Sequence, residues 1–387
     1  MNILYISNSS SLAGGNRSML DLANVLSNRN VNVFFLFPSR GGDTGKQALR
    51  LELNKKGYKF AFLPYTESVH NKNKKDYQGI LFRDYQNKKA LKQMEAYADK
   101  WKIDLVHTNS IVLLVGAMLA KRIHKPHIWH IREQIEEAFN LQFDHKLLYQ
   151  IYFNRASKVI CVSNYIKEQY QKEICKTSSC VIYNGIDMER YKISKKEKDC
   201  NRFNILMCGR IDENKGQKQA VHAVEKIIKE ENYKKIHLKI VGEGNGRYFL
   251  DLKKYVKEQG LETYIDILPF QSDLKELRKE SDISLVCSKS EAFGRVTVEG
   301  MLGRDIVIGA RTSGTMELIQ DGITGYLYEY GNIEDLKNKI LQVIFTWELQ
   351  GKVMDHAQKY AVQNFSNQMS AHKILRIYQQ AIRNHKK

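Results

Sequence analysis

Short apolar runs alternate with longer segments of mixed character along almost the whole chain of 387 residues. The runs are rich in β-branched and aromatic side chains and apolar on both faces, which is typical of strands buried in parallel sheets. The segments between them, such as 18–29 and 333–345, carry apolar residues at helical spacing. The expected strands are 2–7, 31–37, 59–64, 103–108, 127–131, 158–163, 180–184, 203–209, 236–242, 264–270, 282–288, 305–310 and 325–330.

These runs are too numerous for one ordinary sheet, and a polar, charged gap at 188–202 divides them into two series. Each series begins with a strand that runs into a glycine-bearing loop. The pattern predicts an α/β protein of two Rossmann-like parallel-sheet domains, residues 1–188 and 189–365, facing across a cleft. Residues 366–387 form a separate helix, whose role the periodicity leaves open. Ligands should bind at the carboxyl ends of the strands and between the domains.

The chain has a formal net charge of +18. Residues 1–200 hold 32 Lys and Arg against 19 Asp and Glu, a net of +13, and the remaining 29 and 24 leave +5 for the rest. A basic first half is compatible with nucleic acid, anionic lipid or an anionic substrate as partner. A solvated, lysine-rich surface explains the charge equally well.

The six cysteines form no C-x-x-C pair and no zinc-type spacing with histidine. Cys161 and Cys287 lie within apolar runs, which suits small buried side chains in a reducing compartment. The first residues have no basic leader, and the longest apolar stretch, 111–120, is too short for a membrane span and fits a buried helix. We therefore expect a soluble cytoplasmic protein.

The loop after the first strand reads SNSSSLAGGNRSML and leads into a helix. Gly14 and Gly15 would let the backbone approach a phosphate or a sugar at the amino end of that helix. The loop is not G-x-G-x-x-G, and no acidic residue closes the second strand, which counts against a dinucleotide-binding fingerprint. A pair of ordinary turn glycines is the alternative.

The corresponding loop of the second half reads CGRIDENKGQKQA. Arg210 and Lys215 flank a turn and precede a helix that should begin near Gly216. Two cations beside a helix amino end can hold a diphosphate without a metal ion. Solvated loop charges are the alternative.

The stretch SEAFGRVTVEGM at 290–301 follows the strand 282–288 and holds Glu291 and Glu299 eight positions apart. A helix that begins near Gly294 would direct its first amides toward the strand ends, where they can bind phosphate oxygens. Glu291 would then lie in the loop and Glu299 about one turn into the helix, and both could accept hydrogen bonds from sugar hydroxyls. A helix with two exposed acids is the alternative, and the position of the stretch at a strand end disfavours it.

This stretch resembles the E-x7-E motif of the retaining group 1 glycosyltransferases, which have the two-Rossmann GT-B fold. The resemblance covers most of the chain and is strongest from 184 to 335. It includes NGID at 184–187, GRIDENKGQ at 209–217, VGEG at 241–244 and GTMELIQDGITGYLY at 314–328. Five motifs in the family's order are far more specific than any one of them.

The resemblance implies that Arg210 and Lys215 hold the donor diphosphate and that Glu291 contacts hydroxyls of the transferred sugar. It also implies that Glu299 contacts the ribose of the donor. The amides around Phe293, Gly294 and Arg295 would meet the phosphates.

In the first domain, the resemblance places Gly14 and Gly15 near donor and acceptor, and His130 of HIWHIRE close to the reacting sugar. A histidine of the core, or one that acts through a neighbour, is the alternative for His130. The final helix would cross back onto the N-terminal domain.

Three positions depart from the family's pattern. Gly300 replaces the alanine of Glu-Ala-Met, Asp305 stands where a proline is usual, and Ser313 with Gly314 replaces a Gly-Gly pair. None of these removes a charged group from the expected site.

The resemblance implies a retaining hexosyltransferase of bacterial surface-polysaccharide type that needs no metal and no cofactor. Its partners would be a nucleotide sugar and a glycan or lipid-linked acceptor, and it would act in the cytoplasm. The basic first half adds an anionic membrane surface as a candidate partner, with 70–77 and 86–102, including Trp101, as contact segments.

Three other classes of protein compete with this interpretation. A nucleotide-sugar epimerase would share the two-Rossmann fold but lacks this set of motifs. A nucleic-acid-binding protein would suit the charge, but no helix-turn-helix, RNA-binding or zinc motif is present in the sequence. The missing dinucleotide fingerprint disfavours an oxidoreductase.

Overall fold

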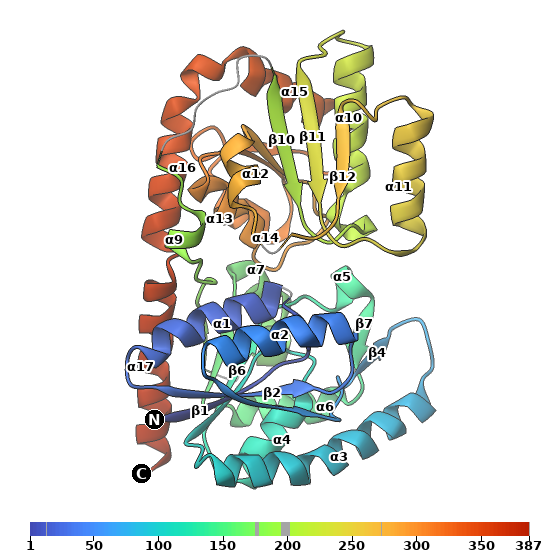
Figure 1. Ribbon diagram of the computed structural model, residues 1–387. Helices are drawn as coiled ribbons and strands as arrows, with labels where there is room; N and C mark the ends of the chain where they lie inside the picture. The colour runs from blue at the N-terminus through green and yellow to red at the C-terminus, as the bar shows by residue number, and fades with distance from the viewer. Residues whose placement is uncertain (13, 175–177, 195–201, 272, 387) are drawn as a thin grey trace. The chain divides into compact units, whose positions relative to one another are not determined.

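The computed structural model describes residues 1–12, 14–174, 178–194, 202–271 and 273–386 of the chain. These residues divide into two compact units (Figure 1). Unit 1 comprises Met1–Gly185 together with Asn367–Lys387, and unit 2 comprises Ile186–Ser366. Two parts of the chain named above lie outside the described residues: Cys175, and residues 195–201 of the polar gap, which include Cys200.

Unit 1 is built on a seven-stranded parallel sheet with the order β3-β2-β1-β5-β6-β8-β9. Every strand of this sheet coincides with one of the apolar runs of the first half to within one residue at its ends or lies inside it, which confirms those predictions. The strands are β1 (Asn2–Ile6), β2 (Asn32–Pro38), β3 (Lys59–Leu63), β5 (Leu105–Thr108), β6 (His127–Ile131), β8 (Lys158–Cys161) and β9 (Ser179–Val181).

Helices connect these strands, and the last helix of the chain also belongs to unit 1. Ala371, Ile374 and Tyr378 of that helix lie in the same buried cluster as Leu20 and Leu22 of α1. The prediction that the C-terminal helix packs on the N-terminal domain is therefore confirmed. The helices are α1 (Gly14–Ser27), α2 (Asp43–Lys55), α3 (Tyr77–Lys100), α4 (Leu114–Arg122), α5 (Glu136–Phe139), α6 (Lys146–Arg155), α7 (Asn164–Gln169), α8 (Gln171–Ile174) and α17 (Asn367–His385).

Unit 2 is built on a six-stranded parallel sheet with the order β12-β11-β10-β13-β14-β15. Each of its strands again lies in a predicted apolar run. The strands are β10 (Phe203–Cys208), β11 (Ile236–Val241), β12 (Ile265–Leu268), β13 (Ile283–Val286), β14 (Ile306–Ala310) and β15 (Tyr326–Tyr328). The helices are α9 (Met188–Tyr191), α10 (Gln217–Lys229), α11 (Gly246–Glu258), α12 (Lys275–Glu280), α13 (Arg295–Leu302), α14 (Ser313–Leu318), α15 (Ile333–Phe345) and α16 (Gly351–Asn364), with 3₁₀ turns η1 (Glu213–Lys215) and η2 (Trp347–Leu349).

Both sheets reverse their strand order at one place. In unit 1 the reversal lies between β1 and β5, and in unit 2 it lies between β10 and β13. Loops that leave the carboxyl ends of such neighbouring strands diverge and leave room for a ligand. The loops after β1, β10 and β13 are the ones that carry the glycine, Arg-Lys and double-glutamate motifs.

Two further features concern membranes. Trp101 is only 8% exposed and stacks on Phe34 with ring centroids 5.2 Å apart, so its prediction as a surface contact was wrong. The apolar stretch 111–120 lies largely in the buried helix α4, as predicted. Among the described residues, no helix combines the length and apolarity needed to cross a membrane.

A small antiparallel pair, β4 (Val69–Asn71) and β7 (Leu141–Phe143), was not predicted. Each strand has only three residues, too few to show a period.

Candidate active site

The loop after β10 brings Arg210 and Lys215 to the carboxyl edge of the unit 2 sheet. Arg210 is 63% exposed on its side chain, and its Nε lies 2.5 Å from Asp212 Oδ2. Asp212 also caps η1, because its side chain accepts a hydrogen bond from the amide of Lys215. The loop thus fixes the backbone beside both cations and leaves the Arg210 guanidinium largely in solvent.

Gly216 ends this loop with φ +71° and begins α10. A Cβ on Gly216 would stand 2.2 Å from the carbonyl oxygen of Cys287, at the end of β13. Only glycine permits this close approach and this backbone conformation. The two loops on either side of the strand-order reversal are therefore in direct contact.

The same contact brings together two side chains that are 76 positions apart in sequence. Lys215 Nζ lies 2.5 Å from Glu291 Oε1, and the Ser288 hydroxyl donates to that oxygen at 2.7 Å. The Lys215 and Glu291 side chains are both partly buried. A charged pair held in this way is fixed in position before any ligand arrives.

Ser313 and Gly314 hold the backbone of the Glu291 loop. The amide of Glu291 donates to Ser313 Oγ at 2.7 Å, and the amide of Gly314 donates to the Glu291 carbonyl at 2.9 Å. A Cβ on Gly314 would be 2.7 Å from that carbonyl oxygen. The departure from Gly-Gly therefore keeps the glycine that the contact requires and replaces the other by a hydroxyl that binds the loop.

Gly294, with φ +94°, precedes α13, which begins at Arg295. The helix begins where the sequence predicted, and its first amides have no partners within the helix itself. The Phe293 side chain is buried and packs edge to face on Phe365, with ring centroids 5.7 Å apart. Phe293 therefore anchors the helix start, and any ligand contact at this position falls to the backbone.

Glu299 lies in the fifth position of α13 and is buried rather than exposed. Its carboxylate lies 3.4 Å from Arg295 Nε and 3.5 Å from Arg278 Nη2. The Arg278 side chain is itself buried and its Nη1 donates to Asp305 Oδ2 at 3.0 Å. Arg278 thus links Glu299 to the aspartate that replaces the family's proline, and the sequence did not single it out.

Gly300, another of the three departures from the family's pattern, also has a steric reason. A Cβ at this position would lie 3.0 Å from Val307 Cγ2 and 3.1 Å from Ser284 Cβ. These side chains belong to β14 and β13, so the glycine lets α13 pack closely on both strands.

In unit 1, Gly14 and Gly15 form the first two positions of α1 and are exposed. A Cβ on Gly15 would meet nothing within 4 Å, so this glycine fills no steric requirement of the fold. The buried Asn16 holds the preceding loop through its amide, which donates to the carbonyls of Ser9 and Ser11. Asn16 thus ties the helix to residues 9 and 11, and the exposed glycines leave the backbone at the helix start open.

His130 lies in β6 and is 2% exposed. Its Nδ1 lies 3.2 Å from His107 Nε2 and 3.3 Å from Arg132 Nη2. Its Nε2 has no hydrogen-bond partner among the described residues. Burial, together with the charge of Arg132, lowers the pKa of His130 well below its usual range, so the ring is neutral.

A group of polar residues in unit 1 was missed by the sequence analysis. Asn8 donates to Glu67 at 3.1 Å, and the Ser110 hydroxyl donates to Glu133. Burial raises the pKa of Glu133 to about 8, against a weaker opposing effect of its hydrogen bond from the Arg132 amide. These residues follow β1, β3, β5 and β6, and an acid directly after a buried strand, as in HIWHIRE, was the available signal.

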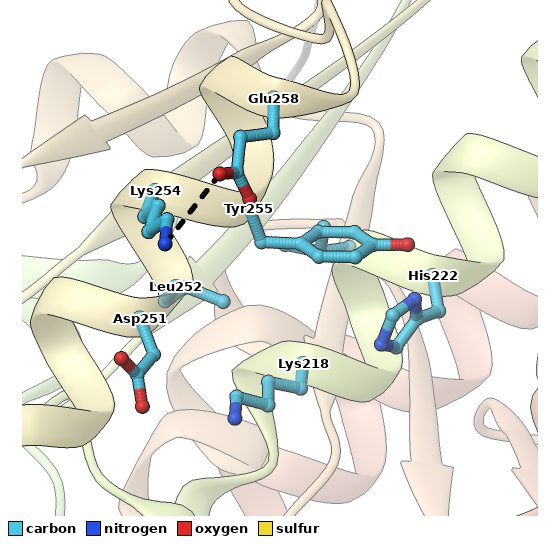
Figure 2. A pocket seen from close by; sticks show the side chains of 8 residues that line it. Lys218, His222, Asp251, Leu252, Lys254, Tyr255 and Glu258 are labelled. Atoms are coloured by element: carbon cyan, nitrogen blue, oxygen red, sulfur yellow. Dashed lines mark ion pairs between the residues drawn. The ribbon is translucent and has the colours of Figure 1, made fainter.

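A separate hollow of about 250 Å³ lies between α10 and α11 (Figure 2). Figure 2 shows Lys218 and His222 on one side and Tyr255 on the other, with an ion pair between Lys254 and Glu258. None of the residues that line it belongs to the predicted site.

The predicted site residues thus form two groups. Arg210, Lys215, Glu291 and Glu299, with the helix start at Phe293, Gly294 and Arg295, are brought together in unit 2. Gly14, Gly15 and His130 lie in unit 1, after β1 and at the end of β6.

Comparison with known families agrees with the two-unit architecture. Residues 12–190 match the model of glycosyltransferase family 4, and residues 189–380 match that of the group 1 glycosyl transferases. The chain belongs to the group 1 glycosyltransferases and is a glycosyltransferase with the GT-B fold. An epimerase is not favoured.

Known relatives resemble the chain over different lengths. An uncharacterized glycosyltransferase of Methanocaldococcus jannaschii is 26% identical over 339 residues, which are 84% of this chain and 91% of the relative. The N-acetyl-alpha-D-glucosaminyl L-malate synthase of Bacillus anthracis is 28% identical over 198 residues, 51% of this chain and 49% of that protein.

Solved structures share the fold over nearly the full length. Anabaena HepE, solved in complex with UDP-glucose, has a TM-score of 0.78 and 22% identity, covering 98% of this chain and 100% of HepE. Sucrose-phosphate synthase from Thermosynechococcus elongatus has a TM-score of 0.77 and 15% identity, covering 98% and 99% of the two chains.

Proposed function

We propose that this glycosyltransferase moves a sugar, with retention at the anomeric carbon, from a nucleotide-diphosphate sugar to a glycan or lipid-linked acceptor. We place the reaction in polysaccharide or glycoconjugate biosynthesis. The observation that carries the proposal is the Lys215–Glu291 pair at the strand-order reversal of unit 2. A nucleotide sugar presents phosphates next to sugar hydroxyls. The pair places a cation that can bind phosphate beside a carboxylate that can accept from hydroxyls.

The phosphate side of the donor site consists of Arg210, Lys215 and the amino end of α13. As the glycosidic bond breaks, negative charge grows on the departing diphosphate and positive character on the sugar. Fixed cations and helix amides stabilise that growing charge without reorganising. We therefore expect transfer without a metal ion, with full activity in the presence of EDTA.

The sugar side consists of Glu291 and Glu299. Each ionised carboxylate has about four acceptor sites. Lys215 and Ser288 occupy one oxygen of Glu291, which leaves its second oxygen for sugar hydroxyls. Glu299, fixed by Arg278 and Arg295, would accept from the ribose.

In unit 1, Gly14 and Gly15 would let the backbone of α1 approach the donor and the acceptor, and His130 would contact the transferred sugar. Two observations support these roles: the glycines are exposed, and the Nε2 of His130 has no hydrogen-bond partner within the described part of the chain.

Uridine is the base to test first. The solved HepE structures hold UDP or UDP-glucose, and the fold is shared over almost the whole chain.

A transfer assay tests the proposal against the epimerase. The full-length protein is incubated with a nucleotide sugar, with and without candidate acceptors, and the products are identified by NMR. The proposal predicts free nucleoside diphosphate and a product with the donor's anomeric configuration, in amounts that depend on the acceptor. An isomerised nucleotide sugar formed from donor alone would contradict it, and an inverted product would refute retention.

We further propose an anionic membrane surface as a partner of unit 1. Unit 1 holds 32 Lys and Arg against 15 Asp and Glu, a net of +17, whereas unit 2 holds 29 and 28, a net of +1. Almost the whole net charge of the protein therefore belongs to one unit. Each basic residue near an anionic bilayer contributes on the order of 1 kcal/mol to binding.

The first half of α3 shows where such a surface would be met. Tyr77, Leu81 and Tyr85 recur at every fourth position and are strongly exposed, Leu81 by 70%. Exposed Lys88 and Lys92 continue the same face of the helix. An apolar and aromatic stripe that runs into lysines matches the chemistry of a bilayer interface.

Helix α6 adds to this face. The start of α6 is tied to α3 because His145 Nε2 lies 2.8 Å from Asp84 Oδ2. Leu147 and Ile151, which come next along α6, are exposed. Of the segments predicted from sequence, this proposal keeps the lysines of 70–77 and 86–102 and drops Trp101.

Co-sedimentation with liposomes tests the membrane proposal. Wild-type protein should bind vesicles that contain anionic phospholipid at low salt and lose binding as salt rises. A variant with Leu81→Ser and Tyr85→Ser should bind several-fold less, whereas Leu250→Ser, an exposed leucine of unit 2, should bind normally. Equal binding of neutral and anionic vesicles, or no binding at all, would contradict the proposal, and so would salt-resistant self-association through this face.

A further inference from the structure

A chain of buried side chains connects the C-terminal helix to His130. Tyr5 of β1 and Tyr378 of α17 have their hydroxyl oxygens 2.6 Å apart. The Tyr378 hydroxyl lies 2.6 Å from His107 Nδ1, and His107 Nε2 lies 3.2 Å from His130 Nδ1. All four side chains belong to unit 1 and are almost completely buried.

The direction of the last hydrogen bond follows from Arg132. A guanidinium can only donate, so His130 Nδ1 must offer a lone pair to Arg132 Nη2. Arg132 is in turn held by Asn109, whose Oδ1 accepts from its Nε at 2.6 Å. The ring of His130 is neutral, so its one proton is on Nε2.

The remaining directions then follow one from another. His107 Nε2 must donate to the same lone pair of His130 Nδ1, which it shares with Arg132 Nη2, because two lone pairs would otherwise face each other at 3.2 Å. Burial lowers the pKa of His107 well below its usual range, so this ring is also neutral and its Nδ1 must accept. Tyr378 therefore donates to His107, and the Tyr5 hydroxyl donates to Tyr378.

We propose that His107 and Tyr378 are positioning residues that act with Arg132 to fix the orientation of His130 and hold it as the Nε2–H tautomer. His130 then offers one N–H to an acceptor oxygen of a bound ligand, a hydroxyl or phosphate oxygen. A donor that is buried without a partner among the described residues is unfavourable, and such an oxygen would satisfy it. That the ligand is the transferred sugar rests on the proposed function, whereas the tautomer does not.

The proposal gives α17 a part in the reaction beyond its packing. Among the four hydrogen-bonded residues, Tyr378 comes from α17, and it lies 271 positions from His107 in the sequence. The segment that returns to unit 1 thereby supplies the hydroxyl that donates to His107 Nδ1.

Two substitutions at His107 separate positioning from packing. The amide of His107→Gln can still donate to His130, whereas His107→Leu fills the buried space and cannot. If His107 only packs, the leucine variant should be the more active one, because the position is fully buried. If His107 positions His130, the glutamine variant should be the more active one. We expect kcat to remain within about threefold of wild type for His107→Gln and to fall at least ~10-fold for His107→Leu, the effect of losing one aligned hydrogen bond.

Tyrosine variants test the other end. Tyr378→Phe removes the donor to His107 Nδ1 and should lower kcat more than it raises the donor KM. Tyr149→Phe is the matched control, because Tyr149 is also a buried tyrosine of unit 1 and its hydroxyl has no hydrogen-bond partner among the described residues. Equal kcat values for the two variants would overturn the role of Tyr378.

Nitrogen-15 NMR of the histidine-labelled, ligand-free full chain reads the tautomer directly. Long-range correlation spectra, assigned with His107→Gln and His130→Gln, should show both rings protonated on Nε2. A signal for His130 protonated on Nδ1 would overturn the proposal, as would a leucine variant at 107 as active as the glutamine one. If no donor is turned over at all, the proposed function fails, and the spectrum still decides the tautomer.

Discussion

Single charged residues of this enzyme differ in what their surroundings let them do. Lys215 is partly buried against Glu291, and Arg210 is mostly in solvent. Lys226, by contrast, pairs with Glu230, four positions on, and with Glu334 of α15 at the protein surface, where ion pairs contribute little. The residues of the candidate site are therefore distinguished by the loops that fix them, not by charge alone.

Lys215→Ala and Arg210→Ala should each lower turnover by about two orders of magnitude or more, because each removes a fixed cation from the departing diphosphate. Lys226→Ala should leave turnover unchanged. Steady-state kinetics on the three variants check this. Near-normal turnover for either Lys215→Ala or Arg210→Ala would refute the assignment of a phosphate clamp.

Glu133 should make the stability of unit 1 depend on pH. Burial raises the pKa of the Glu133 carboxyl from 4.5 to about 8. As the pH rises, the carboxyl therefore loses its proton in the unfolded state before it does so in the folded state. Stability is thus lost progressively between about pH 4.5 and 8, at roughly 1.4 kcal/mol per unit, and Glu133→Gln abolishes this loss.

Thermal unfolding at pH 5 and pH 8 measures the effect. The unfolding temperature of Glu133→Gln minus that of wild type should be larger at pH 8 than at pH 5. A difference that stays constant would show that Glu133 is ionised in the folded protein.

Among the elements, α13 is fixed by contacts at both ends. Gly294 and Phe293 set its start, and Arg278 links Glu299 within it to Asp305 before β14. The aspartate that departs from the family's pattern is thus one partner of a buried ion pair.

Asp305→Ala should destabilise unit 2 by about 3–5 kcal/mol, because it leaves Arg278 buried without its closest carboxylate. The double variant Arg278→Met with Asp305→Leu should recover much of that stability but not the donor affinity, since Glu299 loses a partner. Urea unfolding and donor titration measure the two effects. Equal stability of Asp305→Ala and wild type would contradict this account.

The same elements show how far sequence reasoning reaches. Each of the thirteen strands of the two sheets overlaps a predicted apolar run, because a strand buried on both faces must be apolar throughout. The starts of α10 and α13 were predicted from Gly216 and Gly294, whose positive φ values mark those turns. The three-residue strands β4 and β7 were missed because so few residues show no period.

The site was predictable only in part. Motifs named Lys215 and Glu291 separately, but their contact depends on a glycine that lets two distant loops touch. Arg278 and His107 each acquire their significance from a partner on another strand or helix, which local pattern does not show. Exposure was the weakest inference, as the buried Trp101 illustrates.

At the scale of the whole molecule, charge and chemistry are divided between the units. Unit 1 carries +17 of the net charge of +18 and the apolar stripe of α3. Unit 2 is nearly neutral and carries the Lys215–Glu291 pair. This division supports the two proposals made above, an anionic surface as the partner of unit 1 and a small anionic donor as the ligand of unit 2.

The most direct test of the central claim is a thermal-shift screen of the full chain with UDP-, GDP- and ADP-sugars. A ligand at about 100 times its Kd stabilises the folded protein by roughly 2.7 kcal/mol, which is readily measured as a rise in Tm. We predict that one nucleotide class raises the Tm of wild type and of Lys226→Ala, and that Lys215→Ala loses the rise. A Tm unmoved by every nucleotide sugar, or raised equally in Lys215→Ala, would contradict a donor site built on Lys215 and Glu291.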